Sequence, residues 1–396
     1  MLLLVILGIF LISKGFAIQK NIPKKIVTLK DSVLHYNKII TKGNGLYKEK
    51  DKYIFKGTEI NNYLEIFNRM YRIVSIEKEN IKLISSKNEG VFFLGGNETY
   101  TNSNIDIWLN KGENEQSGIY EKSIDNFENI EKNELDKYFN ILNTDIYNDA
   151  LGENSYLNNG ESSFIINKDQ KVFVKEENGL INEKINSNTS SGIRVILNLK
   201  GDVNIEKGTG SKKDPFIIKG SNHINKYVKL GKDLYQIYDK ENNLFRLRKE
   251  ETLDKKYKFS NKDSGFKPLN KNNIAYFLNN TYYNQLSYKK LLKTCTFYTG
   301  NILDDYNYLN IYNSKISAKV GLMNIFDLNQ SGFVDGYYFV NTSKNESTIS
   351  FSYDKFGHII ENESNVVKKI VPVICINQSD IVEGTGSKKN PYILEK

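Results

Sequence analysis

A nine-residue motif occurs twice in this chain of 396 residues and constrains its fold more than any other feature. The first copy, GTGSKKDPF, covers residues 208–216, and the second, GTGSKKNPY, covers residues 384–392. In each copy the two glycines allow the positive φ of a tight turn, and the residue before proline is driven into an extended conformation. β-Branched residues follow, so each copy predicts a closing turn and a last strand. The alternative, a phosphate-binding loop, needs a helix after the glycines, which this context disfavours.

Three other segments recur in the same order before each copy of the motif. They are a predicted hairpin (residues 62–85 and 226–249), a predicted helix (103–110 and 272–279) and a predicted strand (192–199 and 369–376). Four landmarks in one order indicate a tandem duplication, and 396 residues suffice for two domains. We therefore predict a first repeat domain at 28–218 and a second at 219–396, each folded around its own core.

The spacing of apolar residues predicts the type of each landmark. In the two hairpins, apolar and polar residues alternate with period 2. In the two helices, apolar residues recur at i, i+3 and i+4 behind Asn104 and Asn273, which are the predicted N-caps. Residues 28–43 add a short amphipathic helix with Thr28 in its capping position. The pattern therefore predicts both helices and strands, as in an α+β protein.

The composition indicates a folded protein outside the bilayer. The chain has 26 Tyr and 21 Phe, too many aromatic residues for a disordered chain, and 26% charged residues, too many for a multi-span membrane protein. The net charge of +8 comes with lysine pairs scattered among carboxylates. This pattern predicts solvated faces and no nucleic-acid partner, although weak attraction to anionic wall polymers or head groups is left open.

The N-terminus carries an export-like segment. Residues 2–12 are apolar, about the length of a signal-peptide core and shorter than the roughly 20 residues that span a bilayer. We predict that residues 1–17 are a signal peptide cleaved after Ala17, or that residues 1–18 form a short membrane anchor, with residues 18–27 as a linker in the first case. Membrane contact is predicted through this segment alone, and the predicted location is extracellular or on the cell surface.

The two cysteines, Cys295 and Cys375, neither require nor exclude export. Two cysteines cannot hold a chain of this size together on their own, so its stability is expected to come from packing. A bridge between them is left open as the less favoured alternative.

These landmarks resemble a family of bacterial domains of unknown function that occur, often in tandem, in exported proteins of Gram-positive bacteria. The resemblance covers residues 28–396 and rests on NGLYK and YIFKG within 44–57, the hairpin MYRIVSI…IKLI, AKVGLMNIFDL at 318–328, and the ending with Gly-Thr-Gly and Pro-Tyr. Of the family's Arg-Pro pair before the last strand, the first copy keeps Arg194 and the second keeps Pro372. The resemblance implies a C-type-lectin-like fold in each copy, an α+β arrangement of a twisted antiparallel sheet with two helices.

No catalytic or metal-binding motif stands out in the sequence. The three histidines, His35, His223 and His358, lack a metal-ligand neighbour at i+2 to i+4, and no calcium-binding loop occurs. Nucleophile elbows, zinc-protease helices and complete phosphate-binding loops are also missing. We therefore predict no metal, no cofactor and no enzymatic activity, although a pair of carboxylates of the glycosidase type is not excluded by sequence.

The most suggestive binding stretch covers residues 330–347, with Tyr337, Tyr338 and Asn341 as the predicted ligand-binding residues. Adjacent tyrosines in a strand point to opposite faces, so one ring of the two would face outward. The alternative is that both are ordinary sheet residues beside a polar turn.

The sequence favours a secreted or surface-attached binding or adhesion protein whose ligand is a glycan, a cell-wall polymer or a protein. A structural spacer of the envelope without a specific ligand is the first alternative, and a glycan-acting enzyme is the second. Ligand identity and oligomeric state do not follow from the sequence.

Overall fold

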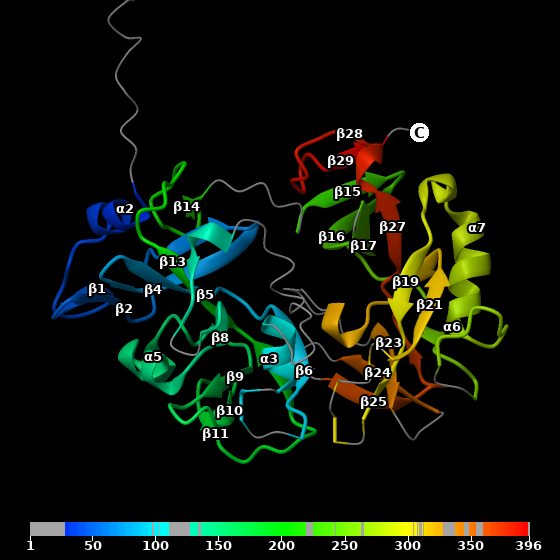
Figure 1. The fold of residues 1–396 in the computed structure, drawn as a ribbon, viewed down its shortest axis with the longest axis horizontal. Coiled ribbons are helices and arrows are strands. Elements are labelled where there is room, and N and C mark those ends of the chain that lie inside the picture. Colours follow the sequence, from blue (N-terminus) through cyan, green and yellow to red (C-terminus); the bar gives the residue numbers. More distant parts are fainter. Residues whose placement is uncertain are drawn as a thin grey trace, which may run out of the picture.

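The computed structural model describes most of the chain from residue 28 onward. The described residues are 28–96, 99–101, 103–110, 127–133, 136–218, 225–241, 243–262, 265–303, 305, 306, 308, 311, 313–327, 337–343, 348–353 and 359–394. The structure is mostly β-sheet with few helices, and Figure 1 shows its two halves side by side. The predicted signal peptide or anchor and the linker lie outside the described residues. Within the described residues, no helix has the length and apolar character needed to cross a bilayer.

The first half, residues 28–218, is built on two sheets. The nine-stranded sheet runs β1 (Gly45–Glu49), β2 (Lys52–Lys56), β4 (Arg69–Glu77), β5 (Asn80–Ser85), β13 (Val195–Lys200) and β7 (Ile130–Glu131), with β3 (Tyr63–Ile66) on β4, β14 (Phe216–Ile217) on β3 and β8 (Phe139–Ile141) on β13. The five-stranded sheet runs β11 (Ile181–Asn182), β10 (Val172–Lys175), β9 (Ser163–Ile166), β12 (Ser190–Ile193) and β6 (Gly90–Phe93). The helices are α2 (Leu29–Tyr36), α3 (Asn104–Leu109) and α5 (Thr144–Asp149), with 3-10 turns η1 (Phe127–Asn129) and η2 (Gly152–Asn154).

The second half, residues 225–394, has one large sheet and three smaller ones. The seven-stranded sheet runs β22 (Val320–Gly321), β27 (Val373–Asn377), β17 (Leu244–Lys249), β16 (Asp233–Glu241), β15 (Tyr227–Leu230), β29 (Tyr392–Leu394) and β28 (Ile381–Glu383). A four-stranded sheet runs β20 (Asn301–Ile302), β23 (Tyr337–Ser343), β24 (Ile349–Tyr353) and β25 (Ile359–Glu363). One two-stranded sheet pairs β19 (Cys295–Tyr298) with β21 (Lys315–Ala318), and another pairs β18 (Tyr257–Lys258) with β26 (Val367–Lys368). A helical stretch comprises α6 (Ile274–Tyr276), η3 (Phe277–Tyr282) and α7 (Tyr283–Gln285), and short turns are η4 (Lys289–Leu291), η6 (Ile325–Asp327) and η7 (Gln378–Asp380).

The central strands of the two large sheets have the same order. The run β14-β3-β4-β5-β13-β8 in the first half corresponds to β29-β15-β16-β17-β27-β22 in the second. In both, the strand at the end of the nine-residue motif (β14 or β29) pairs in parallel with the strand that precedes the hairpin (β3 or β15). Both hairpins also carry a register shift at the same place, between Ile73 and Ser75 and between Ile237 and Asp239. The predicted hairpins are thus confirmed, each with one additional strand before it that the sequence pattern did not separate.

The repeated nine-residue motif forms the same turn in both halves. Gly208 and Gly384 have φ of +107° and +99°, and a Cβ on either would lie 1.8 or 2.2 Å from the following proline's carbonyl oxygen. The carbonyl oxygens of Gly210 and Gly386 each accept a hydrogen bond of 2.8 Å from the first residue of β3 or β15. The motif therefore recurs because each half closes its sheet with the same glycine turn, as the structural interpretation predicted.

The predicted helices are present, with shifted ends. Thr28 accepts the Asp31 N–H at 3.1 Å, but α2 stops at Tyr36, whereas the sequence pattern placed the end of this helix just before Gly43. Asn273 is an N-cap as predicted, whereas the cap of α3 is Ser103 and not Asn104. The Asn104 side chain is used for tertiary hydrogen bonds, described below.

The prediction of two separate cores is wrong where the halves meet. One apolar cluster contains the first-half core together with second-half residues that include Tyr308, Phe326 and Phe351, while the seven-stranded sheet has a second cluster of its own. The rings of Phe92 and Trp108 lie 4.9 Å apart, and the Trp108 indole N–H donates to the Phe326 carbonyl at 2.9 Å. Figure 1 shows α3 and β6 facing β23, β24 and β25 across this junction. Burying these rings removes a large apolar face from water, which favours a joined interior.

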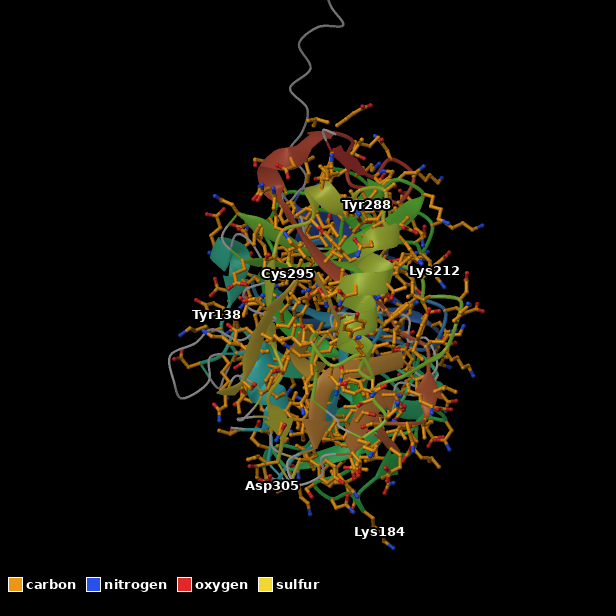
Figure 2. All side chains as sticks on the ribbon, turned by 90° about the vertical axis from the view of Figure 1, so that its right-hand side faces the viewer. Tyr138, Lys184, Lys212, Tyr288, Cys295 and Asp305 are labelled. Atoms are coloured by element: carbon orange, nitrogen blue, oxygen red, sulfur yellow. A yellow bond between two sulfur atoms is a disulfide. The ribbon has the colours of Figure 1, made fainter. Side chains whose placement is uncertain are left out.

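A disulfide joins Cys295 of β19 to Cys375 of β27, with their Cα atoms 5.9 Å apart. The bridge between the two cysteines, which the sequence left open as the less favoured alternative, is therefore present in the structure. Antiparallel pairing of Lys293 with Cys375 brings β19 alongside β27, and this pairing was not evident from the sequence pattern. Figure 2 places Cys295 in the middle of the molecule.

A cluster of charged side chains surrounds the Arg246 guanidinium of β17 in the second half. Arg246 Nε lies 3.3 Å from Asp239 Oδ2, and its Nη2 donates to Glu241 Oε2 at 2.6 Å. The Tyr238 hydroxyl and the Asp327 carboxyl face the same guanidinium. Burial raises the pKa of Asp327 to about 7, against the opposing effect of Arg246.

Stability is therefore expected to increase as pH falls from about 7 towards the pKa of about 4 that Asp has in an unfolded chain. The folded state binds the Asp327 proton more tightly than the unfolded state, which adds about 1.4 kcal/mol for each pH unit in this window. Asp327→Asn keeps an oxygen to accept the Asn324 N–H and should remove this increment. Urea unfolding of both proteins at pH 5 and 6 measures the difference, and identical pH slopes would contradict the prediction.

Candidate functional site

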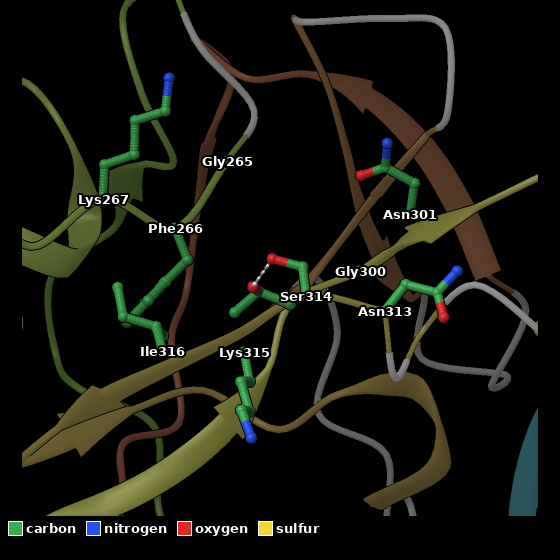
Figure 3. Close-up of a pocket in the computed structure, with 10 residues that line it drawn as sticks. Gly265, Phe266, Lys267, Gly300, Asn301, Asn313, Ser314, Lys315 and Ile316 are labelled. Carbon is green, nitrogen blue, oxygen red and sulfur yellow. Dashed lines mark hydrogen bonds between the residues drawn. The ribbon is translucent and has the colours of Figure 1, made fainter.

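A cavity of about 450 Å³ lies where the chain connects the antiparallel strands β19 and β21, at the Tyr298–Lys315 end of this hairpin, and we call it the hairpin pocket. Its lining residues are Gly265, Phe266, Lys267, Thr299, Gly300, Asn301, Asn313, Ser314, Lys315 and Ile316. They come from the loop before the second-half helix and from the chain on either side of the hairpin end (Figure 3). A volume of this size admits a segment of a polymer or a small molecule.

The pocket combines an apolar floor with hydrogen-bonding groups. Phe266 is buried and Ile316 is half-buried. The hydroxyls of Thr299 and Ser314 lie 3.1 Å apart, and Figure 3 shows this hydrogen bond in the middle of the view. The amide groups of Asn301 and Asn313 add both donors and acceptors. This mixture of hydroxyl, amide and apolar surface suits a ligand that carries several hydroxyl groups on a carbon framework.

The charge of the lining favours an anionic ligand. Lys267 and Lys315 contribute two ammonium groups, and the ten described lining residues include no carboxylate. Figure 3 shows the two lysine side chains extending to opposite sides of the pocket. Both residues are exposed, so their effect is a long-range attraction that salt screens, and not a tight ion pair.

The hairpin pocket is tied to the main sheet from two directions. The disulfide links β19 to β27, and the Lys293 N–H donates to the Cys375 carbonyl at 2.8 Å just before β19 begins. On its other side, β20 pairs in parallel with β23, so that Asn301 lies opposite Thr342. A site with these attachments is held by the fold and not only by a surface loop.

The predicted ligand-binding residues lie on the strand beside the pocket. Tyr337, Tyr338 and Asn341 all belong to β23, and Asn341 immediately precedes the residue that pairs with Asn301. Tyr337 and Tyr338 are at the far end of β23, paired with β24. The positions of these three side chains fall outside the described part of the structure, so their role in binding stays a prediction.

Sequence reasoning missed the residues that line the hairpin pocket. They come from three segments separated by up to about 50 residues, and none of these segments carries a recognisable motif. The only local signal is the glycine of Thr299-Gly300-Asn301, which marks a turn after a strand.

Carboxylates interact elsewhere in the first half. Burial raises the pKa of Glu89, and the neighbouring Glu161 raises it further, while Arg69 lies 3.4 Å away and opposes both effects. Neither glutamate lines the hairpin pocket or a smaller cavity of about 120 Å³ beside β3. That smaller cavity is lined by Glu65 and by the exposed Glu206, which do not form a buried acidic pair.

Among the described residues, no group of three or more His, Cys, Asp and Glu side chains is placed to hold a metal ion. His35 lies on α2, whereas His223 and His358 are outside the described residues.

Comparison with protein-family models, with curated proteins and with solved structures found no match for this chain.

Proposed function

We propose that this chain is an exported or surface-attached, non-catalytic binding protein with tandem C-type-lectin-like domains. Its ligand is a glycan or a cell-wall polymer that bears hydroxyl and anionic groups, and it binds in the hairpin pocket. The observation that carries this proposal is the lining of the pocket, with its apolar floor, two amides, two hydroxyls and two lysines.

Two further observations support the proposal. The disulfide between Cys295 and Cys375 is typical of proteins outside the reducing cytosol, which agrees with the export-like N-terminus. The repeated strand order supports a pair of related modules, as the family resemblance implies.

An array of glycans, wall fragments and proteins tests the proposal directly. Binding to acidic glycans or polyol-phosphate polymers, weakened by added salt, is the expected result. If the chain bound only proteins on the array, the proposed glycan or wall-polymer ligand would be wrong, and the ligand would be a protein. Complete absence of binding by a folded sample would favour the structural spacer, and release of new sugar ends from a bound glycan would favour the enzyme.

Reversing one lysine charge in the pocket is expected to weaken binding. Lys315→Glu should lower the affinity for an oligogalacturonate by about three- to tenfold, the effect of one exposed charge pair. Lys290→Glu makes the same charge change at an exposed lysine outside the pocket and serves as the control. Titration calorimetry at two salt concentrations measures both effects, and equal losses in the two variants would contradict the assignment of the pocket.

A further inference from the structure

Two arms of one chain segment supply seven of the ten residues that line the hairpin pocket. Residues 299–301 form the first arm and residues 313–316 the second. The chain between them, which we call the junction segment, is described at residues 303, 305, 306, 308 and 311. Asp305, Tyr306 and Tyr308 of this segment lie against the first half, so the segment that carries both arms of the pocket is attached to both halves of the protein.

One first-half side chain, Asn104, binds the junction segment at two points. Its Nδ2 donates to the Tyr306 carbonyl at 2.8 Å and to the Phe93 carbonyl of its own half at 3.0 Å. Its Oδ1 accepts the Tyr308 N–H at 3.1 Å. The amide of Asn104 therefore ties β6 to the junction segment within a buried environment.

Tyr308 completes the attachment from the other side. Its hydroxyl accepts the Phe93 N–H at 2.6 Å, and its buried ring lies 5.9 Å from that of Phe92. The Tyr306 ring lies 4.5 Å from that of Phe93. These contacts fix the segment by aromatic packing as well as by hydrogen bonds.

A chain of backbone hydrogen bonds leads from this anchor to the pocket. The Ile311 N–H donates to the Tyr308 carbonyl at 3.0 Å, and the Gly300 N–H donates to the Ile311 carbonyl at 3.0 Å. Gly300 lines the pocket, and beside it the Thr299 N–H donates to the Ser314 carbonyl at 2.8 Å, which joins the two arms. Three hydrogen bonds thus connect Asn104 of the first half to a pocket residue of the second.

The first half is shaped to receive the segment. Gly95 has φ of +80°, and a Cβ there would lie 2.7 Å from Asn104 Nδ2. A Cβ on Gly96 would lie 2.8 Å from Asp305 Oδ2. Gly95 therefore leaves room for the Asn104 amide that binds the segment, and Gly96 leaves room for Asp305 of the segment itself.

We propose that Asn104 is a positioning residue for the hairpin pocket, and that the first half supports the ligand site of the second half. The two halves then act as one binding unit, and not as two binding modules joined in series. This inference rests on the proposed function for its ligand, but the positioning itself is tested without a ligand.

Hydrogen exchange of the full-length protein tests the positioning. Asn104→Ala should raise the exchange of backbone amides at 299–301 and 313–316 by about tenfold or more, while β5 and β13 keep their protection. Asn143→Ala is the matched control, because Asn143 caps α5 of the same half by accepting the Ile146 N–H and makes no hydrogen bond to the described residues of the junction segment. Should Asn104→Ala not fold, Tyr308→Phe removes the hydroxyl that accepts the Phe93 N–H, keeps the ring, and should loosen the same amides to a smaller extent.

Binding to an oligogalacturonate and to poly(glycerol phosphate) provides the second measurement. Each probe that binds the wild-type protein should lose at least about tenfold in affinity in Asn104→Ala and little in Asn143→Ala. Wild-type exchange at the pocket in a folded Asn104→Ala protein, or equal loosening in the control, would overturn the inference. If neither probe binds the wild-type protein, the proposed ligand class fails, and the exchange comparison still decides the role of Asn104.

Discussion

Replacing Arg194 by methionine is expected to lower the free energy of unfolding by about 3 kcal/mol or more. Arg194 is fully buried between β12 and β13. Its guanidinium donates to the Ser85 carbonyl at 3.0 and 2.8 Å and to the Leu157 carbonyl at 2.6 Å. Methionine fills a similar length but leaves both carbonyls without these donors, and each buried unsatisfied group costs about 1–3 kcal/mol.

Burying the charged Arg194 guanidinium lowers the free energy of unfolding and so opposes the gain from its hydrogen bonds. Desolvation lowers the pKa of Arg194 to about 10, so part of the hydrogen-bond energy is offset by the cost of burying a charge. Urea unfolding at pH 7 measures the net effect. Lys184→Met removes a positive charge from an exposed side chain (Figure 2) and should stay within about 0.5 kcal/mol of wild type. A loss below about 1 kcal/mol for Arg194→Met would mean that other groups satisfy the two carbonyls.

Removing the disulfide is expected to cost about 4 kcal/mol. The bond closes a loop of 80 residues, and a loop of this length restricts the unfolded chain by roughly that amount in the chain-entropy description. Cys295→Ala combined with Cys375→Ala should show this loss in urea unfolding. The same bond holds β19 to β27, so the hairpin pocket, the proposed ligand site, should lose its structure before the sheets of the first half unfold.

Addition of a reductant provides the matched comparison. Reduction should shift the unfolding midpoint of the wild-type protein and leave that of the double variant unchanged. An unchanged wild-type midpoint, with both thiols shown to be free by mass spectrometry, would contradict the expected contribution of the bond.

Local patterns in the sequence predicted the individual elements well. The alternation in residues 62–85 and 226–249 and the glycine-proline turns correspond to β4–β5, β16–β17 and the closing turns. These features depend on backbone preferences and on which face of a strand is buried, and both are written in neighbouring residues. The run at residues 192–199 was predicted as one strand, but it divides at Arg194 because the chain passes there from the five-stranded to the nine-stranded sheet.

Contacts between distant segments were not predictable in the same way. Asn104 has the right side chain to cap a helix, and local reasoning gave it that role, but its amide binds carbonyls and an N–H that are up to about 200 residues away. The pairing of Cys295 with Cys375 depends on a strand register that no local pattern specifies. The hairpin pocket arises from the same kind of contact, since its arms are brought together by the hairpin and the junction segment.

The joined interior limits how this protein could change by recombination. The Trp108 indole is buried and donates its N–H to a carbonyl of the other half. The Phe92 ring packs near the Phe326 ring. Excising or exchanging either copy alone would leave these aromatic groups uncovered and prone to aggregate. A longer protein evolved from this one is therefore expected to gain both halves together, or insertions in surface loops. It is not expected to gain a single half added at one end.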